Sequence, residues 1–216
     1  MKVDLHKIDG SKAGKQIDLP ESIFGIEPNE HVVYLAVKQF RAAQRQGTHK
    51  AKERSDVKGS TRKIKKQKGT GTARAGDIKN PLFRHGGTIF GPRPRDYSFK
   101  LNKKVKDLAR KSALSAKLRD GEILIVEDFQ LEDHKTRTFI EVMNNLGVSL
   151  DKALFLLSEM DPNTALAARN IPNARVSESR SVNTYDLLNA DKLIFTESGV
   201  KTLIEILEKK DVKATA

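Results

Sequence analysis

The chain has 216 residues, of which 38% are hydrophobic and none is cysteine, and its formal net charge is +12 at pH 7. The missing cysteine excludes disulfides and thiolate metal sites, and the length allows one domain or two small ones. No apolar stretch is long enough to span a membrane and no secretory or transit signal is visible, so we expect a soluble, cytoplasmic protein.

The N-terminal part predicts a pair of short strands followed by a helix. Residues 3–5 and 16–19 are expected to form the strands, around a turn between Gly10 and Gly14. Asn29 is expected to cap a helix of residues 30–44. One face of this helix should be buried, because apolar residues recur at helical spacing, at Val32, Val33, Ala36, Val37 and Phe40.

Residues 41–100 carry all of the excess positive charge. They contain 17 Lys and Arg against 4 acids, whereas the rest of the chain has 23 basic and 24 acidic residues. Eight of the 14 glycines also lie here, and helical periodicity is lost from residue 48 onward. The segment has too few large apolar residues to offset the entropy of ordering it, so it should not build a core of its own. A dense polyanion, usually nucleic acid, is the expected partner.

The C-terminal half predicts alternating helices and strands. Asn102 is expected to cap a helix that runs to about residue 119, with Val105, Leu108 and Ala109 on its buried face, Lys111 on its exposed face and Gly121 at its end. Apolar runs without alternation predict buried strands. The expected strands lie at residues 123–126, 153–157, 174–176 and 192–196, and the helices at 135–146, 163–168, 185–188 and 198–208.

This pattern predicts an α/β fold with a mostly parallel sheet flanked by helices and a long basic extended loop inserted. Residues 1–47 and 101–216 are expected to form the globular α/β domain. Residues 48–100 are expected to form an extended basic RNA-binding arm, and residues 209–216 a frayed tail.

Motifs for catalysis or cofactor binding are missing. Gly69-Thr-Gly71 lacks the third glycine and the preceding strand of a dinucleotide fingerprint, and the Gly10–Lys15 stretch is one residue short of a phosphate-binding loop. The histidines, at positions 6, 31, 49, 85 and 134, lack metal-ligand spacing. We therefore expect no catalytic residue, no metal site, no cofactor and no enzyme activity.

Three features of the basic arm favour structured RNA over a solubilising tail. Glycine is interleaved with the cations, which lets the backbone approach phosphates closely. Aromatic residues are interleaved as well and could stack on bases or anchor the arm. Arginine alternates with proline at Pro92-Arg-Pro-Arg95, which holds guanidinium groups on a stiff backbone. The residues expected to bind RNA are Arg45, Lys50, Lys52, Arg54, Lys58, Arg62, Lys63, Lys65, Lys66, Gln67, Lys68, Gly69, Thr70, Gly71, Arg74, Lys79, Arg84, His85, Arg93, Arg95 and Lys100.

A series of short motifs in this order resembles a known family. It comprises Lys66-Gln-Lys-Gly-Thr-Gly71, Ala73-Arg74-Ala-Gly76, Gly86-Gly87, Phe90-Gly-Pro, Pro94-Arg-Asp-Tyr97, Lys100-Leu-Asn-Lys-Lys104, Ala113-Leu-Ser115 and Ala167-Ala-Arg-Asn170. The chain resembles the large-subunit ribosomal protein four family of bacterial type along nearly its whole length. It departs at Lys65, where the family commonly has an aromatic residue, and at Thr72, where it has arginine.

The resemblance implies a structural constituent of the large ribosomal subunit. Its partners would be large-subunit ribosomal RNA (rRNA) and neighbouring ribosomal proteins, and it would bind early in assembly. The arm would thread into rRNA, with its tip at residues 65–74 helping to line the nascent-peptide exit tunnel. Some members also repress their own operon by binding its mRNA, which makes that mRNA a possible partner. Changes near the site that matches Lys68 affect macrolide antibiotics in tunnel-narrowing members.

Two other functions are compatible with parts of the sequence. A nucleotide-binding enzyme could use the α/β sheet, and tight binding of NAD or ATP to the pure protein would favour it. A nucleoid or antitermination factor would act away from the ribosome, and sedimentation of most copies outside ribosomal subunits would favour it.

Overall fold

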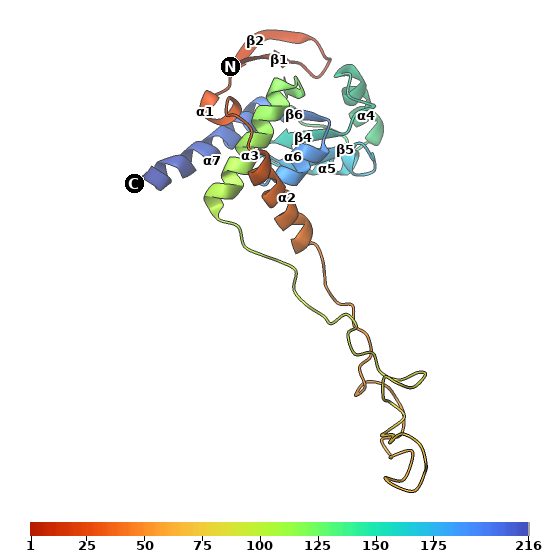
Figure 1. Ribbon diagram of the computed structural model, residues 1–216. Coiled ribbons are helices and arrows are strands. Elements are labelled where there is room, and N and C mark those ends of the chain that lie inside the picture. Colours follow the sequence, from red (N-terminus) through yellow and green to blue (C-terminus); the bar gives the residue numbers. More distant parts are fainter. Residues whose placement is uncertain (216) are drawn as a thin grey trace. The chain divides into compact units, whose positions relative to one another are not determined.

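A computed structural model describes residues 1–215, with side chains described as far as Glu208 (Figure 1). The chain divides into two compact units. The first contains residues 1–40 together with the chain from residue 100 onward, and the second is Arg41–Phe99. None of the helices in the described part of the chain is both long and apolar enough to cross a bilayer.

A six-stranded sheet lies at the centre of the first unit, in the order β2-β1-β3-β6-β4-β5. Neighbouring strands are parallel except for the antiparallel β1–β2 pair. The strands are β1 (Lys2–His6), β2 (Lys12–Asp18), β3 (Ile123–Val126), β4 (Ala153–Leu157), β5 (Ala174–Glu178) and β6 (Lys192–Thr196). The predicted α/β fold with a mostly parallel sheet is confirmed.

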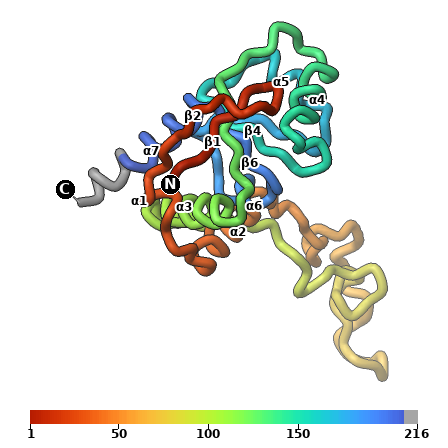
Figure 2. Tube along the Cα trace, turned by 90° about the horizontal axis from the view of Figure 1, so that it is seen from above, coloured from red at the N-terminus to blue at the C-terminus, as the bar shows by residue number. Residues whose placement is uncertain are grey.

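Strand β1 pairs with β3, although the two strands are far apart in the sequence. Leu5 aligns with Ile125 of β3, although the whole of the second unit lies between them in the chain. Figure 2 shows the N-terminal strands β1 and β2, in red, lying with the C-terminal half of the chain. Ile125 aligns in turn with Phe195 of β6. The N-terminal and C-terminal parts of the first unit therefore form one sheet.

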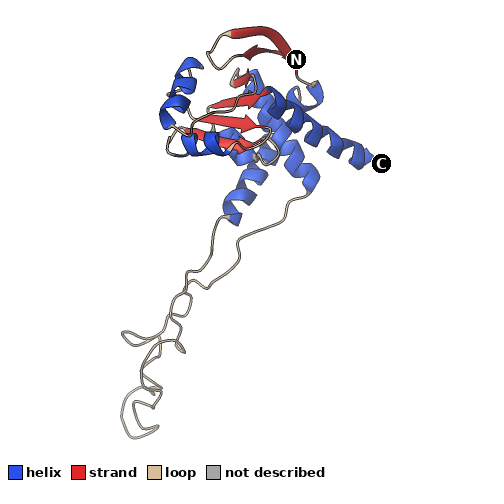
Figure 3. Cartoon of the chain, turned by 180° about the vertical axis from the view of Figure 1, so that it is seen from behind, coloured by secondary structure: helices blue, strands red, loops and turns tan. Residues whose placement is uncertain are grey.

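Seven helices are assigned in the described residues, and all lie outside residues 44–102, which Figure 3 draws as loop. They are α1 (Glu21–Phe24), α2 (Glu30–Ala43), α3 (Lys103–Arg119), α4 (Thr136–Asn145), α5 (Pro162–Arg169), α6 (Thr184–Asn189) and α7 (Glu197–Thr215). Helix α1 was not predicted, because four residues are too few to show a helical period.

The apolar strand runs are buried on both faces of the sheet, as their lack of alternation predicts. On one face, side chains such as Leu154 and Phe195 pack with α1, α3, α6 and α7. On the other face, Phe155 and Ile194 pack with α4 and α5. Phe155 meets Phe139 of α4 edge to face, with ring centroids 4.9 Å apart. Strands β3, β4 and β6 therefore each contribute side chains to both hydrophobic cores.

The predicted helix ends are largely confirmed. Asn29 Oδ1 accepts the Val32 N–H at 3.1 Å, and Asp161 caps α5 with Pro162 as its first residue. Gly121 follows α3 with φ +69°, where glycine avoids the steric cost of the left-handed region. Asn102 is the N-cap of α3, as predicted. Its carbonyl accepts the Lys106 N–H at 3.2 Å, although its side chain makes no capping bond.

The structure differs from the prediction in the position of the first turn and in the buried faces of α2 and α3. The turn lies before Lys12, and Gly14 sits inside β2. Only Ala36 of the predicted α2 face is fully buried. In α3, Lys111 is buried and Leu108 is 37% exposed, the reverse of the prediction. Helix α3 packs against both α1 and α6, so its buried surface is wider than the single stripe that its apolar residues suggest.

The C-terminal helix extends past its predicted end at residue 208. Helix α7 continues to Thr215, and Ala216 lies outside the described residues. The frayed tail of residues 209–216 stays a prediction.

Candidate nucleic-acid interface

Backbone hydrogen bonds join the outgoing and returning passes of the second unit. The Arg95 N–H donates to the Gly47 carbonyl at 3.1 Å, and the Ala51 N–H donates to the Pro92 carbonyl at 3.0 Å. Further along, the Thr88 N–H donates to Lys52 at 2.9 Å, and the Ile64 N–H to Gly76 at 3.0 Å. These bonds are unevenly spaced, and no strand is assigned to residues 44–102.

The second unit has no hydrophobic core of its own. Its buried residues among 41–99 are Gly47, Asp77 and Gly87, and none has a large apolar side chain. This agrees with the sequence-based expectation that the basic segment cannot bury enough apolar surface to fold as a domain core.

Ion pairs of Asp77 and Glu53 connect the two passes of the second unit, and Asp56 forms a local pair. The buried Asp77 has its Oδ1 2.9 Å from Arg54 Nη2, and Glu53 lies 2.5 Å from Arg93. Lys50 Nζ lies 2.9 Å from Asp56 and lowers the pKa of that carboxyl. Three of the cations predicted to bind RNA, Lys50, Arg54 and Arg93, are thus also structural. The sequence signal for this pairing is the presence of acids at positions 53, 56 and 77 in an otherwise cationic segment.

The cations between residues 57 and 76 are not compensated by acids. This stretch contains Lys58, Arg62, Lys63, Lys65, Lys66, Lys68 and Arg74, and no Asp or Glu. Lys63 donates to Gln67, and Lys65 Nζ donates to Thr72 Oγ1 at 2.9 Å. No acidic partner is found for Arg62, Lys66, Lys68 or Arg74 among the residues described. The most concentrated positive charge of the chain is therefore free to meet an external anion.

A hollow of about 600 Å³ opens beside this cationic stretch. It is lined by Ser60, Arg62, Lys63, Ile64, Lys65, Lys66 and Ile78. All of its ionisable lining residues are cationic, so the hollow suits an anionic ligand with some apolar surface.

Two arginines predicted to bind RNA lie over one aromatic ring. The guanidinium carbons of Arg45 and Arg95 are 5.3 and 4.4 Å from the centroid of the Tyr97 ring. These are cation–π distances, which stabilise the arginines without neutralising them. Both side chains stay exposed, so Tyr97 anchors positive charge within the second unit.

The glycines of the second unit have two different roles. A Cβ added to Gly87 would lie 2.3 Å from the backbone nitrogen of Arg54, so this glycine allows the two passes to touch. Gly69 and Gly71 have φ values of +81° and +61° and open space around them. The predicted close approach of backbone to phosphate is therefore possible at Gly69 and Gly71 and blocked at Gly87.

The structure leaves the predicted RNA-binding residues at the surface. All of them are exposed except Lys79, which is half-buried, and all lie in the second unit except Lys100. His85 has a positive φ of 64°. No cluster of three or more potential metal ligands was found in the described part of the chain.

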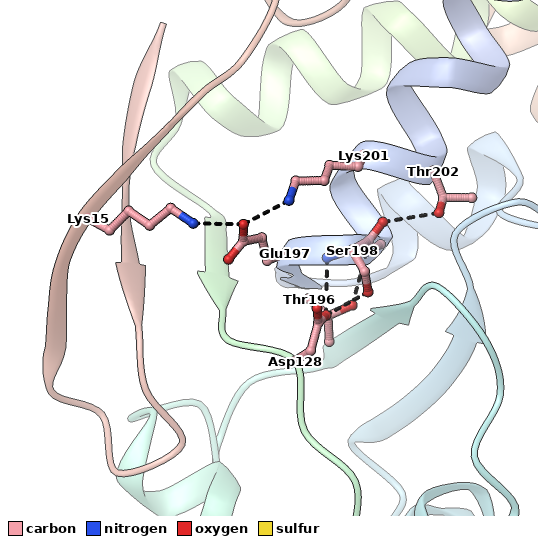
Figure 4. A network of polar contacts seen from close by, with 8 residues as sticks. Lys15, Asp128, Thr196, Glu197, Ser198, Lys201 and Thr202 are labelled. Carbon is pink, nitrogen blue, oxygen red and sulfur yellow. Dashed lines mark hydrogen bonds and ion pairs between the residues drawn. The ribbon is translucent and has the colours of Figure 1, made fainter.

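Another hollow, of about 650 Å³, lies in the first unit, where β3, β4 and β6 end. Ligands of open α/β sheets bind at this edge, and phosphates prefer free helix N-termini there. Here side chains of the protein already accept hydrogen bonds from backbone N–H groups at the start of α7 (Figure 4). Asp128 Oδ1 accepts the Ser198 N–H at 3.1 Å, and Thr196 Oγ1 accepts the Gly199 N–H at 3.2 Å. The Asp128 carboxylate would repel a phosphate, so the geometry does not favour a nucleotide enzyme.

Glu197, the first residue of α7, strengthens this capping arrangement. It lies 2.8 Å from both Lys15 of β2 and Lys201, and their ammonium groups lower the pKa of its carboxyl. A carboxylate in the first turn also favours the helix dipole. Lys15 and Lys201 are thus already paired with an internal acid.

The comparison with known proteins identifies the family. The sequence model of the ribosomal protein L4/L1 family matches residues 17–206. The chain belongs to the ribosomal protein L4/L1 family. It is 55% identical over 207 residues to the large ribosomal subunit protein uL4 of Bacteroides fragilis, covering 96% of this chain and 100% of the relative. The uL4 protein of Flavobacterium johnsoniae is 53% identical over 209 residues, covering 97% and 100%.

Membership in the ribosomal protein L4/L1 family confirms the resemblance that the motifs indicated. A further relative, the uL4 protein of Amoebophilus asiaticus, is 51% identical over 205 residues, which are 95% of this chain and 98% of the relative. Proteins of this family are structural, and the prediction that the chain is not an enzyme is confirmed.

Proposed function

We propose that this chain is a structural constituent of the large ribosomal subunit and that its basic segment binds large-subunit rRNA. The observation that carries the proposal is the run of exposed cations between residues 57 and 76, which contains no acid. The similarity to large ribosomal subunit proteins supports rRNA as the expected polyanion.

Binding is driven largely by electrostatics. Lys and Arg side chains displace condensed counterions from rRNA phosphates, and the released ions gain entropy. Three of the four acids of the second unit, Glu53, Asp56 and Asp77, are paired with cations within the unit and so oppose this little. The chain acts with the ribosome in the cytoplasm, binds early in subunit assembly and contacts neighbouring ribosomal proteins.

The tip of the arm, residues 65–74, helps to line the nascent-peptide exit tunnel. Its residues are exposed, and it combines cations with glycines that have open space around them. Such a loop can lie along phosphates and still present a narrow surface to a passing peptide. The same cations would bind a structured mRNA leader, so the operon mRNA is a competing ligand for this surface.

Sedimentation of the full-length protein tests the proposal. Cell lysate is separated on a sucrose gradient at high salt, and the protein is expected to travel with large subunits. Recovery of most copies outside ribosomal subunits would contradict the proposal and favour a nucleoid or antitermination factor.

Salt dependence tests the electrostatic mechanism separately. If about 10 phosphates are neutralised, the logarithm of the affinity for rRNA should fall with the logarithm of the salt concentration with a slope of roughly −7 to −9. Filter binding of purified protein to transcribed large-subunit rRNA measures this slope. A slope near zero would contradict the mechanism.

A further inference from the structure

Phe90 is the most exposed aromatic side chain of the second unit. Its side chain is 99% exposed, whereas Phe83 is 38% exposed and Tyr97 lies against two arginines. A phenyl ring in water has an unfavourable hydration free energy and gains by contact with another surface. A partner that covers the Phe90 ring would therefore gain binding free energy from this contact.

The backbone on both sides of Phe90 is held in place. On one side, the Thr88 N–H donates to the Lys52 carbonyl at 2.9 Å. On the other side, the Pro92 carbonyl accepts the Ala51 N–H at 3.0 Å. Gly91 lies so close to the opposite pass that an added Cβ would be 2.3 Å from the Ala51 Cβ. The ring is thus presented from a short loop that is fixed before any partner binds, which lowers the entropy cost of binding.

The charges around this loop favour RNA as the partner. Arg84, Arg93 and Arg95 flank it in sequence, and Lys52 stands on the facing pass. The nearest acid in that pass, Glu53, is paired with Arg93. An exposed aromatic ring between cations matches unpaired nucleotides, whose bases stack on aromatic side chains while their phosphates meet Lys and Arg.

We propose that Phe90 stacks on an unstacked base of the large-subunit rRNA. This inference rests on the proposed rRNA binding and adds one defined contact to it. The phenyl ring has no hydrogen-bonding group, so it recognises the face of a base and not its identity. The cations of the second unit supply the affinity for phosphates, and Phe90 selects a place where a base is out of the helix.

Tryptophan fluorescence tests the contact directly, because the chain contains no tryptophan. Phe90→Trp introduces a single reporter, and transcribed large-subunit rRNA is the probe. Stacking on a base is expected to quench the emission strongly and to protect the indole from acrylamide. Leu150→Trp is the matched control, since Leu150 is 91% exposed and lies in the first unit. Its emission should change little. Unchanged emission of Phe90→Trp in the complex would overturn the proposal.

An affinity series provides a second test that does not depend on fluorescence. Phe90→Ala is expected to weaken rRNA binding by about 5- to 150-fold, the range for removal of one base–aromatic stack. Phe90→Leu keeps an apolar side chain without a ring face and should bind nearly as weakly as Phe90→Ala. Wild-type affinity of Phe90→Leu would overturn the proposal, as would an indole covered only after other ribosomal proteins are added.

The salt slope separates this inference from the proposed function. Phenylalanine is uncharged, so the slope should be the same for wild type, Phe90→Ala and Phe90→Leu. If the wild type shows a steep slope and Phe90 variants bind as tightly as it does, only the stacking inference fails. If the wild type itself binds rRNA weakly and without salt dependence, the proposed function fails.

Discussion

The backbone N–H of Ile64 donates a hydrogen bond to the carbonyl oxygen of Gly76 at 3.0 Å. This bond joins the two passes at the base of a loop that carries Lys65, Lys66, Lys68 and Arg74. The side chains of the loop contribute to neither hydrophobic core. The charge that we assign to rRNA binding is therefore separate from the residues that stabilise the sheet.

Deleting residues 62–74 should leave the first unit stable and weaken rRNA binding. The deletion removes six cations, and the magnitude of the salt slope should fall by about 0.7–0.9 for each phosphate that is no longer neutralised. The urea midpoint of unfolding should stay unchanged, because no core side chain is removed. Urea denaturation and filter binding measure the two effects.

A full-length variant with the same six cations changed to glutamine is the control for the deletion. It keeps the chain length, and its salt slope should decrease by the same amount. Loss of cooperative unfolding in the deletion variant would show that the tip and the sheet are not energetically separate.

Gly87→Ala and Gly76→Ala form a matched pair within the second unit. The Cβ at position 87 would lie 2.3 Å from the Arg54 backbone nitrogen, so the two passes must move apart and the Thr88–Lys52 bond should break. The Cβ at position 76 meets nothing within 4 Å. We expect faster chymotrypsin cleavage in the second unit for Gly87→Ala only. Equal cleavage rates for both variants would mean that the contact between the passes is not populated in solution.

Much of the sheet could be predicted because its strands are buried on both faces. Residues 123–126 and 153–157 are continuous apolar runs, 192–196 has an apolar centre at 193–195, and the structure assigns β3, β4 and β6 to the predicted residues. The packing of α3 could not be predicted in this way. Lys111 is buried because α3 contacts elements on two sides, and that arrangement depends on tertiary structure rather than on helical period.

The candidate interface, too, could be predicted only in part from the sequence. Charge density is a property of the sequence, so the cations around Lys66 could be assigned directly. The pairing of Arg54 with Asp77 depends on how a chain without regular secondary structure folds back, and no periodic pattern encodes it. The same is true of Phe90, whose near-complete exposure depends on how the neighbouring residues are held.

The cap of α5 should make stability depend on pH. Asp161 Oδ2 accepts the hydroxyl of Thr164 at 2.6 Å and its N–H at 3.0 Å, and these bonds lower the pKa of Asp161. A carboxyl whose pKa is lowered by folding stabilises the protein above its unfolded pKa, about 3.9, and this stabilisation is lost as the pH falls through the folded pKa.

Asp161→Asn keeps a side-chain acceptor but removes the charge. The variant should be less stable than wild type by a few tenths of a kcal/mol at pH 7, and the difference should shrink as the pH falls below the unfolded pKa of about 3.9. Asp161→Ala loses the acceptor as well and should cost about 1 kcal/mol at pH 7. Urea unfolding at pH 7, 5 and 3 measures these differences. A constant deficit of Asp161→Asn at all three values would contradict a role for the charge.

Lys68 provides the sharpest test of the tunnel assignment. Its side chain is exposed, no acidic partner is found for it in the described structure, and Gly69 with φ +81° follows it. Lys68→Glu reverses the charge in an open loop, so the fold should be unaffected while the local contact with rRNA weakens. If the tip lines the exit tunnel, ribosomes that contain this variant should show altered sensitivity to macrolide antibiotics.

Lys7→Glu is the control for Lys68→Glu, because Lys7 is an exposed lysine of the first unit and the change in net charge is the same. Ribosomes with Lys7→Glu should keep wild-type macrolide sensitivity. Growth inhibition in strains that express a single version of the protein measures the effect. Unchanged sensitivity for Lys68→Glu, with normal incorporation into large subunits, would contradict the placement of Lys68 at the tunnel. It would leave rRNA binding by the remaining cations intact, because each of them contributes its own phosphate contact.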